Sequence, residues 1–179
     1  RIIGSISLPI FLLFNSQETG CLLALIIFLI CSITDFLDGF LARKLNQESN
    51  LGRMLDPVAD KLLVILVLSF LILIYQGTYN YLLGIPSVVI ISREILVSGV
   101  REYFGSTDGN FDVMKLSKLK TAMQMIAIIC LLVSKLSIVE NLYLFQLGII
   151  CLWLAAGFAL YTGLVYICRA IILLNKEKT

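Results

Sequence analysis

Two pairs of aspartates lie at the ends of two long apolar runs. Asp35 and Asp38 follow the first run, and Asp56 and Asp60 precede the second. An ionised carboxylate at the centre of a spanning helix costs about 2.5–3.5 kcal/mol on insertion scales, so carboxylates beside apolar runs require a compensating partner. We interpret that partner as a pair of divalent cations.

The composition indicates a membrane protein. Of the 179 residues, 59% are hydrophobic and 15% are charged, and the mean hydropathy is +0.97. Soluble domains contain about 45–50% apolar and about 25% charged residues. We therefore expect an all-α, polytopic membrane protein that forms one transmembrane domain over residues 1–179. The net charge of +2 is too small to indicate a nucleic-acid partner.

The chain contains no histidine. This excludes histidine nucleophiles, histidine acid–base catalysis and histidine metal ligands, and with them phosphatidyl transfer of the phospholipase-D type. The cysteines show no C-x-x-C spacing and lie in apolar runs, where cysteine behaves as a small hydrophobic residue. They are Cys21, Cys31, Cys130, Cys151 and Cys168.

Hydropathy predicts six spanning helices, each of which needs about 20 apolar residues. The expected spans are residues 1–14, 21–45, 52–75, 81–104, 115–136 and 142–174. The first span is short, and the chain opens at Arg1 within an apolar run without an initiating Met. We therefore expect that this span lacks its first residues, and we recognise no signal peptide.

Basic residues predict the orientation of the spans. The turns after the first, third and fifth spans hold only Lys135, whereas the other loops, the C-terminal tail and the flanking helix ends hold nearly all the remaining Lys and Arg residues. Cytoplasmic loops carry an excess of Lys and Arg, so we expect both termini and the aspartates to face the cytoplasm. For four basic residues we favour this topological role alone: Arg53, Arg169, Lys176 and Lys178.

Helical spacing brings the aspartates of each run onto one face. Residues i, i+3, i+4 and i+7 of a helix share a face. The residues on these faces are Asp35, Asp38, Gly39 and Ala42 in the first helix, and Gly52, Asp56 and Asp60 in the second. The short loop between the two helices predicts antiparallel neighbours whose acidic faces converge.

Converging carboxylates indicate a metal site. Hard cations such as Mg²⁺ take carboxylate oxygens and keep water or substrate phosphate in their other positions. Two such ions about 3.5–4 Å apart can bridge a diphosphate, so we expect two Mg²⁺ or Mn²⁺ ions. Without metal, carboxylates this close would repel one another and some would stay protonated. The alternative, a solvated loop face, does not account for the regular spacing.

The small and basic residues beside the aspartates leave two interpretations open. Gly39, Ala42 and Gly52 either leave room for a ligand near the backbone or allow close helix packing, as small residues do in membranes. Arg43 either pairs with a ligand phosphate or marks the cytoplasmic interface.

The full pattern, D-x-x-D-G-x-x-A-R-x(8)-G-x-x-x-D-x-x-x-D, resembles the signature of the CDP-alcohol phosphatidyltransferase family at every defined position. This resemblance implies a six-helix membrane enzyme, typically dimeric, that transfers a phosphatidyl or similar group from a CDP-linked donor to an alcohol and releases CMP. It implies that the aspartates hold two divalent ions and that Asp60 is the general base on the acceptor hydroxyl. The residues implied for the donor pocket are Asp38, Gly39, Ala42, Arg43 and Gly52.

Further short sequence motifs extend the resemblance from about Thr34 to Thr121. The chain contains T-D-F-L-D-G-F-L-A-R, L-D-P-V-A-D-K, S-R-E-I-L-V-S-G-V-R-E and S-K-L-K-T. These are similar to a bacterial subgroup of the family whose acceptor is sn-glycerol 3-phosphate. The resemblance implies CDP-diacylglycerol as the donor and a multi-pass location in the bacterial inner membrane, among membrane lipids and as a homodimer.

A phosphorylated acceptor needs cations near the metals. The expected acceptor-phosphate ligands are Arg93, Arg101, Lys118 and Lys120. The two arginines lie about 12 Å apart along one helix, and an arginine can grip phosphate with two hydrogen bonds. The two lysines lie about 200° apart around theirs, so one faces the site, and the resemblance favours Lys118. The alternative is that Arg93 pairs with Glu94 or Glu102 and that the lysines reach the lipid headgroups.

Three competing functions remain open from the sequence. Within the family, the acceptor could instead be phosphatidylglycerol, inositol phosphate or serine. A divalent-cation transporter would tend to place its aspartates near the bilayer midplane on broken helices, not beside a cytoplasmic loop. A structural scaffold would leave the acidic pattern unexplained.

Overall fold

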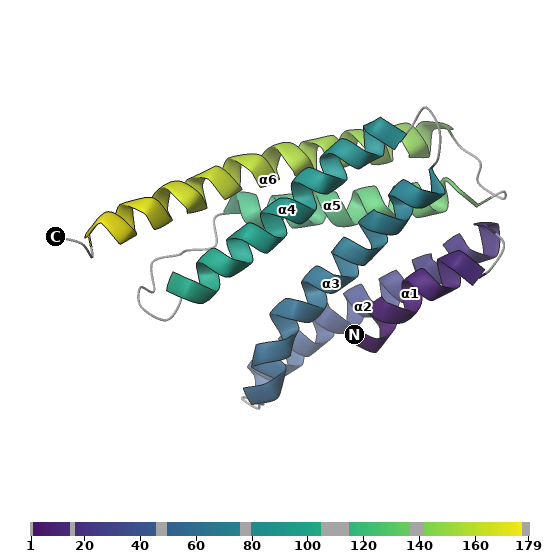
Figure 1. The fold of residues 1–179 in the computed structure, drawn as a ribbon. Helices are drawn as coiled ribbons and strands as arrows, with labels where there is room; N and C mark the ends of the chain where they lie inside the picture. Colours follow the sequence, from purple (N-terminus) through teal and green to yellow (C-terminus); the bar gives the residue numbers. More distant parts are fainter. Residues whose placement is uncertain are drawn as a thin grey trace.

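In the computed structural model, the described residues are 2–14, 17–45, 50–75, 80–104, 115–136 and 142–176 (Figure 1). Within these ranges the secondary structure is helical, without strands, which confirms the all-α prediction. The helices are α1 (Ile2–Phe14), α2 (Gln17–Leu45), α3 (Asn50–Ile74), α4 (Asn80–Phe104), α5 (Lys115–Val133) and α6 (Leu142–Lys176).

Over the residues that the structure describes, two helices are long and apolar enough to cross a membrane. They carry the segments Asn80–Val100 of α4 and Leu142–Ile172 of α6. The apolar segments of three other helices are shorter: Glu18–Thr34, Lys61–Ile74 and Leu119–Val133. These three segments are confined to the residues whose side chains the structure describes, so they set no upper limit on the apolar length of α2, α3 and α5. The prediction of six spans therefore stays a prediction.

The helices alternate in direction through the chain. In Figure 1, the C-terminal ends of α2, α4 and α6 and the start of α3 and α5 are the left-hand ends of these helices, whereas the start of α1 lies nearer the middle of the molecule. We call this left-hand end the motif end, because the aspartate-bearing parts of α2 and α3 lie there. The opposite end holds the end of α1, α3 and α5 and the start of α2, α4 and α6.

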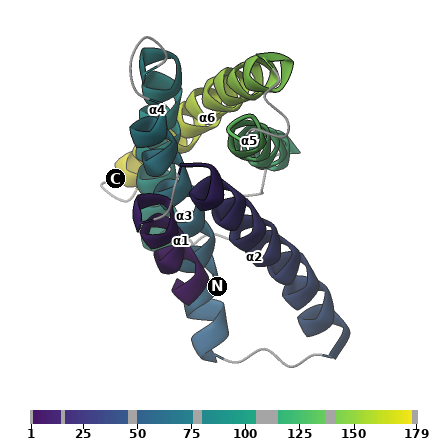
Figure 2. The same ribbon diagram turned by 90° about the vertical axis from the view of Figure 1, so that its right-hand side faces the viewer.

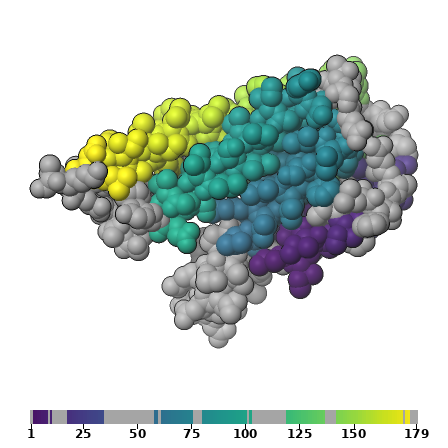
Figure 3. Space-filling view, in the orientation of Figure 1, coloured from purple at the N-terminus to yellow at the C-terminus, as the bar shows by residue number. Residues whose placement is uncertain are grey.

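The helices form two groups. Helix α6 packs against α5 and α4, and α1 packs against α2 and α3. Contacts of α2 with α5, and of α3 with α4 and α5, join the groups. On the face seen in Figure 3, α4 lies between α6 and α3.

Helices α2 and α3 run in opposite directions, as predicted, but they do not pack along each other over the described residues. Helix α1 packs against both, and Figure 2 shows α2 and α3 diverging toward the motif end. The prediction that they are direct neighbours is therefore wrong. The motif halves bring charged residues rather than apolar surface to this end, so the burial that draws helices together is reduced there.

A seam of buried residues, half of which are Gly or Ala, explains the close packing of α6. Its buried positions recur at alternating spacings of four and three residues, the pattern of a helix that buries one stripe. The seam consists of Gly148, Leu152, Ala155, Ala159, Thr162 and Tyr166. A Cβ atom added to Gly148 would lie 2.9 Å from Cγ of Leu131, so glycine is needed for α5 to approach this closely.

A proline inside α4 is matched by a donor from α6. Pro86 has no backbone N–H, so the carbonyl of Leu82, four residues earlier, loses its usual helical partner. The indole Nε1 of Trp153 donates a hydrogen bond to this carbonyl oxygen at 3.1 Å. The pair couples α4 to α6 at the point where α4 is weakened.

Large apolar side chains cover the outside of α4 and α6. The exposed examples include Ile85, Val88, Ile95 and Leu96 on α4, and Leu154, Leu160, Leu164 and Ile171 on α6. Extensive exposed apolar surface marks a membrane or protein contact. Together with the two long apolar helices, it indicates a membrane protein.

Candidate functional site

The backbone places the predicted metal ligands on two helices. Asp35 and Asp38 lie one turn apart on α2, and Asp56 and Asp60 lie one turn apart on α3. Their side chains lie outside the described residues, as do those of Arg43, Arg101 and Lys118. The same holds for Gly39, Ala42 and Gly52 of the predicted donor pocket. Among the residues that are described, no group of three His, Cys, Asp or Glu could hold a metal ion.

The described part of the site is a charged cluster on α4 and α5. Arg93 is 6% exposed and Lys120 is 3% exposed, although both carry a charge. Lys120 Nζ donates a hydrogen bond to Oε1 of Glu94, and Nη1 of Arg93 lies 3.5 Å from the same oxygen. One carboxylate is therefore shared between two buried cations, which leaves the three side chains with a net positive charge.

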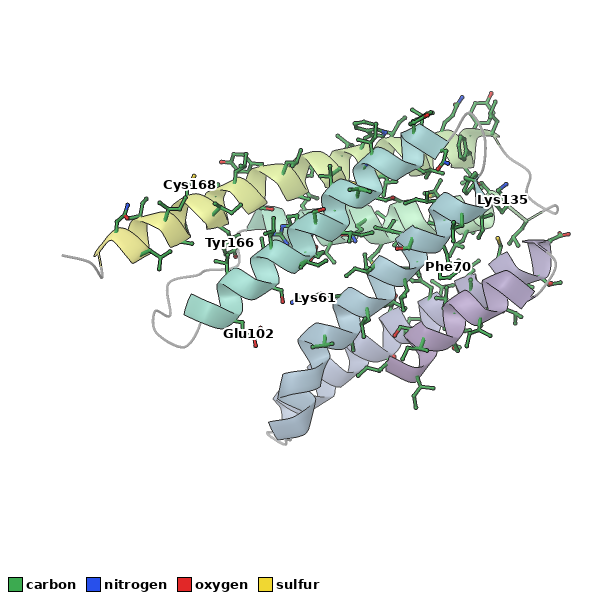
Figure 4. The ribbon with its side chains drawn as sticks, in the orientation of Figure 1. Lys61, Phe70, Glu102, Lys135, Tyr166 and Cys168 are labelled. Atoms are coloured by element: carbon green, nitrogen blue, oxygen red, sulfur yellow. The ribbon has the colours of Figure 1, made fainter. Side chains whose placement is uncertain are left out.

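Helix α6 holds the arginine in place. Arg93 Nη2 donates a hydrogen bond to Thr162 Oγ1 at 3.1 Å, while that hydroxyl donates to the carbonyl of Phe158 at 2.8 Å. The guanidinium carbon lies 6.0 Å from the ring centre of Tyr166, which Figure 4 shows between α6 and α4. A Cβ atom on Gly163 would come within 3.1 Å of Arg93 Cγ, so this glycine makes room for the arginine stem.

These contacts refine the predictions for the basic residues. Arg93 pairs with Glu94, as the alternative interpretation held, whereas Glu102 is exposed. Lys120 faces the bundle interior, so the expectation that it reaches the headgroups while Lys118 faces inward is wrong for Lys120. The spacing of the two lysines predicted that their side chains point to different sides of α5. It did not predict which of the two would contact α4.

The structure adds a contact that the sequence did not single out. Lys61, the residue after Asp60, is half-buried, and its Nζ donates a hydrogen bond to Oγ of Ser98 on α4. Figure 4 shows the Lys61 side chain between α3 and α4. The signal available from the sequence was a lysine at the start of an apolar segment, directly beside a predicted catalytic aspartate.

The motif, the helical fold and this cationic cluster together define a class of protein. A sequence model of the CDP-alcohol phosphatidyltransferase family matches residues 1–172, and the chain belongs to that family. The match extends well beyond the motif itself, through all six helices as far as the end of the α6 apolar segment.

Several similar proteins share one name, CDP-diacylglycerol–glycerol-3-phosphate 3-phosphatidyltransferase. The chain is 41% identical to the protein of Wigglesworthia glossinidia brevipalpis over 143 residues, covering 79% of this chain and 74% of the relative. It is 39% identical to that of Rickettsia bellii over 165 residues, covering 92% and 87%. It is 32% identical to that of Cereibacter sphaeroides over 211 residues, covering 99% and 95%.

Proposed function

We propose that this protein transfers the phosphatidyl group of CDP-diacylglycerol to sn-glycerol 3-phosphate and releases CMP, as a phosphatidylglycerophosphate synthase in phospholipid biosynthesis. The observation that carries the proposal is the complete aspartate pattern from Asp35 to Asp60 in a chain of this family. The names of the relatives support the choice of donor and acceptor.

The proposed chemistry uses the four aspartates. Their oxygen-only donor set suits Mg²⁺ or Mn²⁺, and Asp35, Asp38, Asp56 and Asp60 would hold two such ions once α2 and α3, which diverge at the motif end in Figure 2, approach each other there. When bound, these ions would neutralise charge on the donor diphosphate. Asp60 accepts the proton of the acceptor 1-hydroxyl, whose oxygen attacks the phosphatidyl phosphorus. The bond from that phosphorus to the CMP oxygen breaks as the new ester forms.

The donor and acceptor are bound by different helices in this proposal. Asp38, Gly39, Ala42, Arg43 and Gly52, on α2 and the start of α3, line the CDP pocket. Basic residues of α4 and α5 attract the acceptor phosphate: Arg93, Arg101, Lys118 and Lys120. The position of Arg93 and Lys120 on neighbouring elements, both in contact with the carboxylate of Glu94, supports this second assignment by gathering two cations at one place.

The same proposal includes the membrane arrangement. All six helices cross the bacterial inner membrane, both termini and the motif end face the cytoplasm, and the enzyme is a homodimer among membrane lipids. The C-terminal ends of α2, α4 and α6 and the start of α3 and α5 point to the same side of the bundle, which supports this topology (Figure 1). A soluble acceptor and a lipid donor can then meet at the cytoplasmic interface.

The test is CMP release by the purified protein in detergent. We expect release only when CDP-diacylglycerol and glycerol 3-phosphate are both present, its loss with a chelator and its recovery with Mg²⁺ or Mn²⁺. Turnover with serine, inositol phosphate or phosphatidylglycerol in place of glycerol 3-phosphate would contradict the acceptor. Metal flux into liposomes without any CDP-lipid, and without CMP release, would favour a transporter instead.

A further inference from the structure

Lys61 is a described cation on α3, next to the second half of the motif, and it contacts α4. It follows Asp60 directly on α3, and its ammonium donates to Ser98 on α4. A helix turns about 100° per residue, so Lys61 points to a different side of α3 from Asp60. This difference directs Lys61 toward α4, the helix that also carries Arg93, rather than along the face of the aspartates.

The charges around Lys61 differ from those around the other buried cations. Arg93 and Lys120 share the carboxylate of Glu94. For Lys61, no carboxylate among the side chains that the structure describes lies within ion-pair distance, and its partner is the neutral hydroxyl of Ser98. A half-buried ammonium with a neutral partner retains its capacity to pair with an anion.

The chemistry of the pair fits a phosphate oxygen. An ammonium has three N–H donors, of which Ser98 takes one. The Ser98 hydroxyl accepts from Lys61, so its own O–H can be donated to an anion. Lysine is a common phosphate ligand that acts as a point charge. Lys61 and Ser98 therefore present one positive charge and several donors from two helices.

We propose that Lys61, together with Ser98, binds the phosphate of the acceptor and thereby selects a phosphorylated alcohol. This inference rests on the proposed function and adds a specificity-determining residue to it. Ser98 lies on the same helix as Arg93 and Arg101, whereas the proposed donor pocket lies on α2 and the start of α3. For this reason we assign the pair to the acceptor phosphate and not to the donor diphosphate.

The experiment compares initial rates of purified Lys61→Met and Lys61→Arg with those of the wild type. Glycerol 3-phosphate is varied at saturating CDP-diacylglycerol, and the donor is then varied at saturating acceptor. We expect Lys61→Met to raise the acceptor KM about 10- to 100-fold, the range for losing a hydrogen bond to a charged group. The donor KM should change little, and Lys61→Arg should restore part of the acceptor affinity because it keeps the charge.

One further variant, with two controls, allows the proposal to be tested even if Lys61→Met does not fold. Ser98→Ala should raise the acceptor KM by a smaller factor. Its matched control is Ser69→Ala on α3, because the Ser69 hydroxyl donates to the carbonyl of Ile65 in its own helix. Lys135→Met, at the opposite end of the bundle, is the control for losing a lysine, and both controls should keep the wild-type acceptor KM.

Three results would overturn the assignment. A rise in the donor KM with an unchanged acceptor KM would place Lys61 in the donor site. A fall in kcat with both KM values unchanged would make it a positioning residue for Asp60. Wild-type KM values in Lys61→Met and Ser98→Ala would remove the pair from the site. In each case normal wild-type turnover preserves the proposed function, whereas a wild type inactive with glycerol 3-phosphate would overturn both.

Discussion

The two ends of the helix bundle hold their polar side chains in different ways. At the motif end, Lys61, Arg93 and Lys120 reach across helices, and one carboxylate, that of Glu94, is shared by two of them. At the opposite end, Tyr75 donates to the carbonyl of Leu131 at 2.8 Å and forms a 2.7 Å hydrogen bond with Ser134.

The opposite end also contains a cation, but its described contact is with the face of an aromatic ring. Lys135 Nζ lies 4.3 Å from the ring centre of Tyr75, which packs against the ring of Phe145 at 5.2 Å between centres. Neutral hydrogen bonds and aromatic contacts are characteristic of this end, whereas the contacts described at the motif end are made by charged side chains. We therefore expect substitutions of Asp60 and Lys61 at the motif end to change kinetics, and substitutions of Glu94, which pairs with two cations, and of residues at the opposite end to change stability.

The largest effect should come from Asp60→Asn. An asparagine cannot accept the acceptor proton, and general-base catalysis contributes about 10²- to 10⁴-fold to a rate. We expect turnover to fall by about that factor, while binding of CDP-diacylglycerol, measured by thermal shift, is largely retained. Near-normal turnover in this variant would remove Asp60 as the base.

The next largest effect should come from Glu94→Gln. This change leaves Arg93 and Lys120 without their shared charge, and breaking a fully buried ion pair costs about 3–5 kcal/mol. Because 15% of the Glu94 side chain is exposed, we expect a smaller loss of stability, about 2–3 kcal/mol. Thermal unfolding in detergent measures it, with Glu102→Gln as the exposed control. Equal unfolding temperatures for the two variants would contradict a structural role for the cluster.

Tyr75→Phe tests whether the opposite end of the bundle affects stability without affecting kinetics. The variant loses the hydrogen bonds to Leu131 and Ser134 but keeps the aromatic ring. We expect a loss of stability of about 1–2 kcal/mol, with the kcat and KM values of the wild type. A change in acceptor KM, without a matching change in stability, would show that the opposite end also affects the site.

The smallest effect should come from Trp153→Phe, which removes the donor to the Leu82 carbonyl. We expect a loss of about 1 kcal/mol in the native background. In a Pro86→Ala background the helix supplies its own N–H to that carbonyl, so the same substitution should cost less. Equal losses in both backgrounds, measured by thermal unfolding, would show that the indole does not compensate for the proline.

The sequence predicted the helices well because their apolar runs are long and separated by short polar turns. It predicted the direction of α2 relative to α3 from their short connection, but not that α1 would pack against both. That depends on close approach between distant residues. A Cβ atom on Gly4 of α1, for example, would lie 2.8 Å from Sγ of Cys31 on α2.

For the site, the sequence predicted the aspartates and the basic residues as a set, and this stays a prediction. Spacing could not assign partners across helices, because Glu94 meets Lys120, and Lys61 meets Ser98, only once α3, α4 and α5 are packed. Arg93 illustrates the same limit: its hydrogen bond to Thr162 joins residues 69 positions apart in the chain. Such contacts follow from tertiary packing and leave no local pattern in the sequence.

The most direct test of the account is the identity and stoichiometry of the product. Purified protein is incubated with CDP-diacylglycerol and radiolabelled glycerol 3-phosphate, and both CMP and labelled lipid are quantified. The account predicts phosphatidylglycerophosphate and CMP in equal molar amounts, formed by the wild type and not by Asp60→Asn. CMP release without label in the lipid, or label in the lipid without CMP, would contradict it.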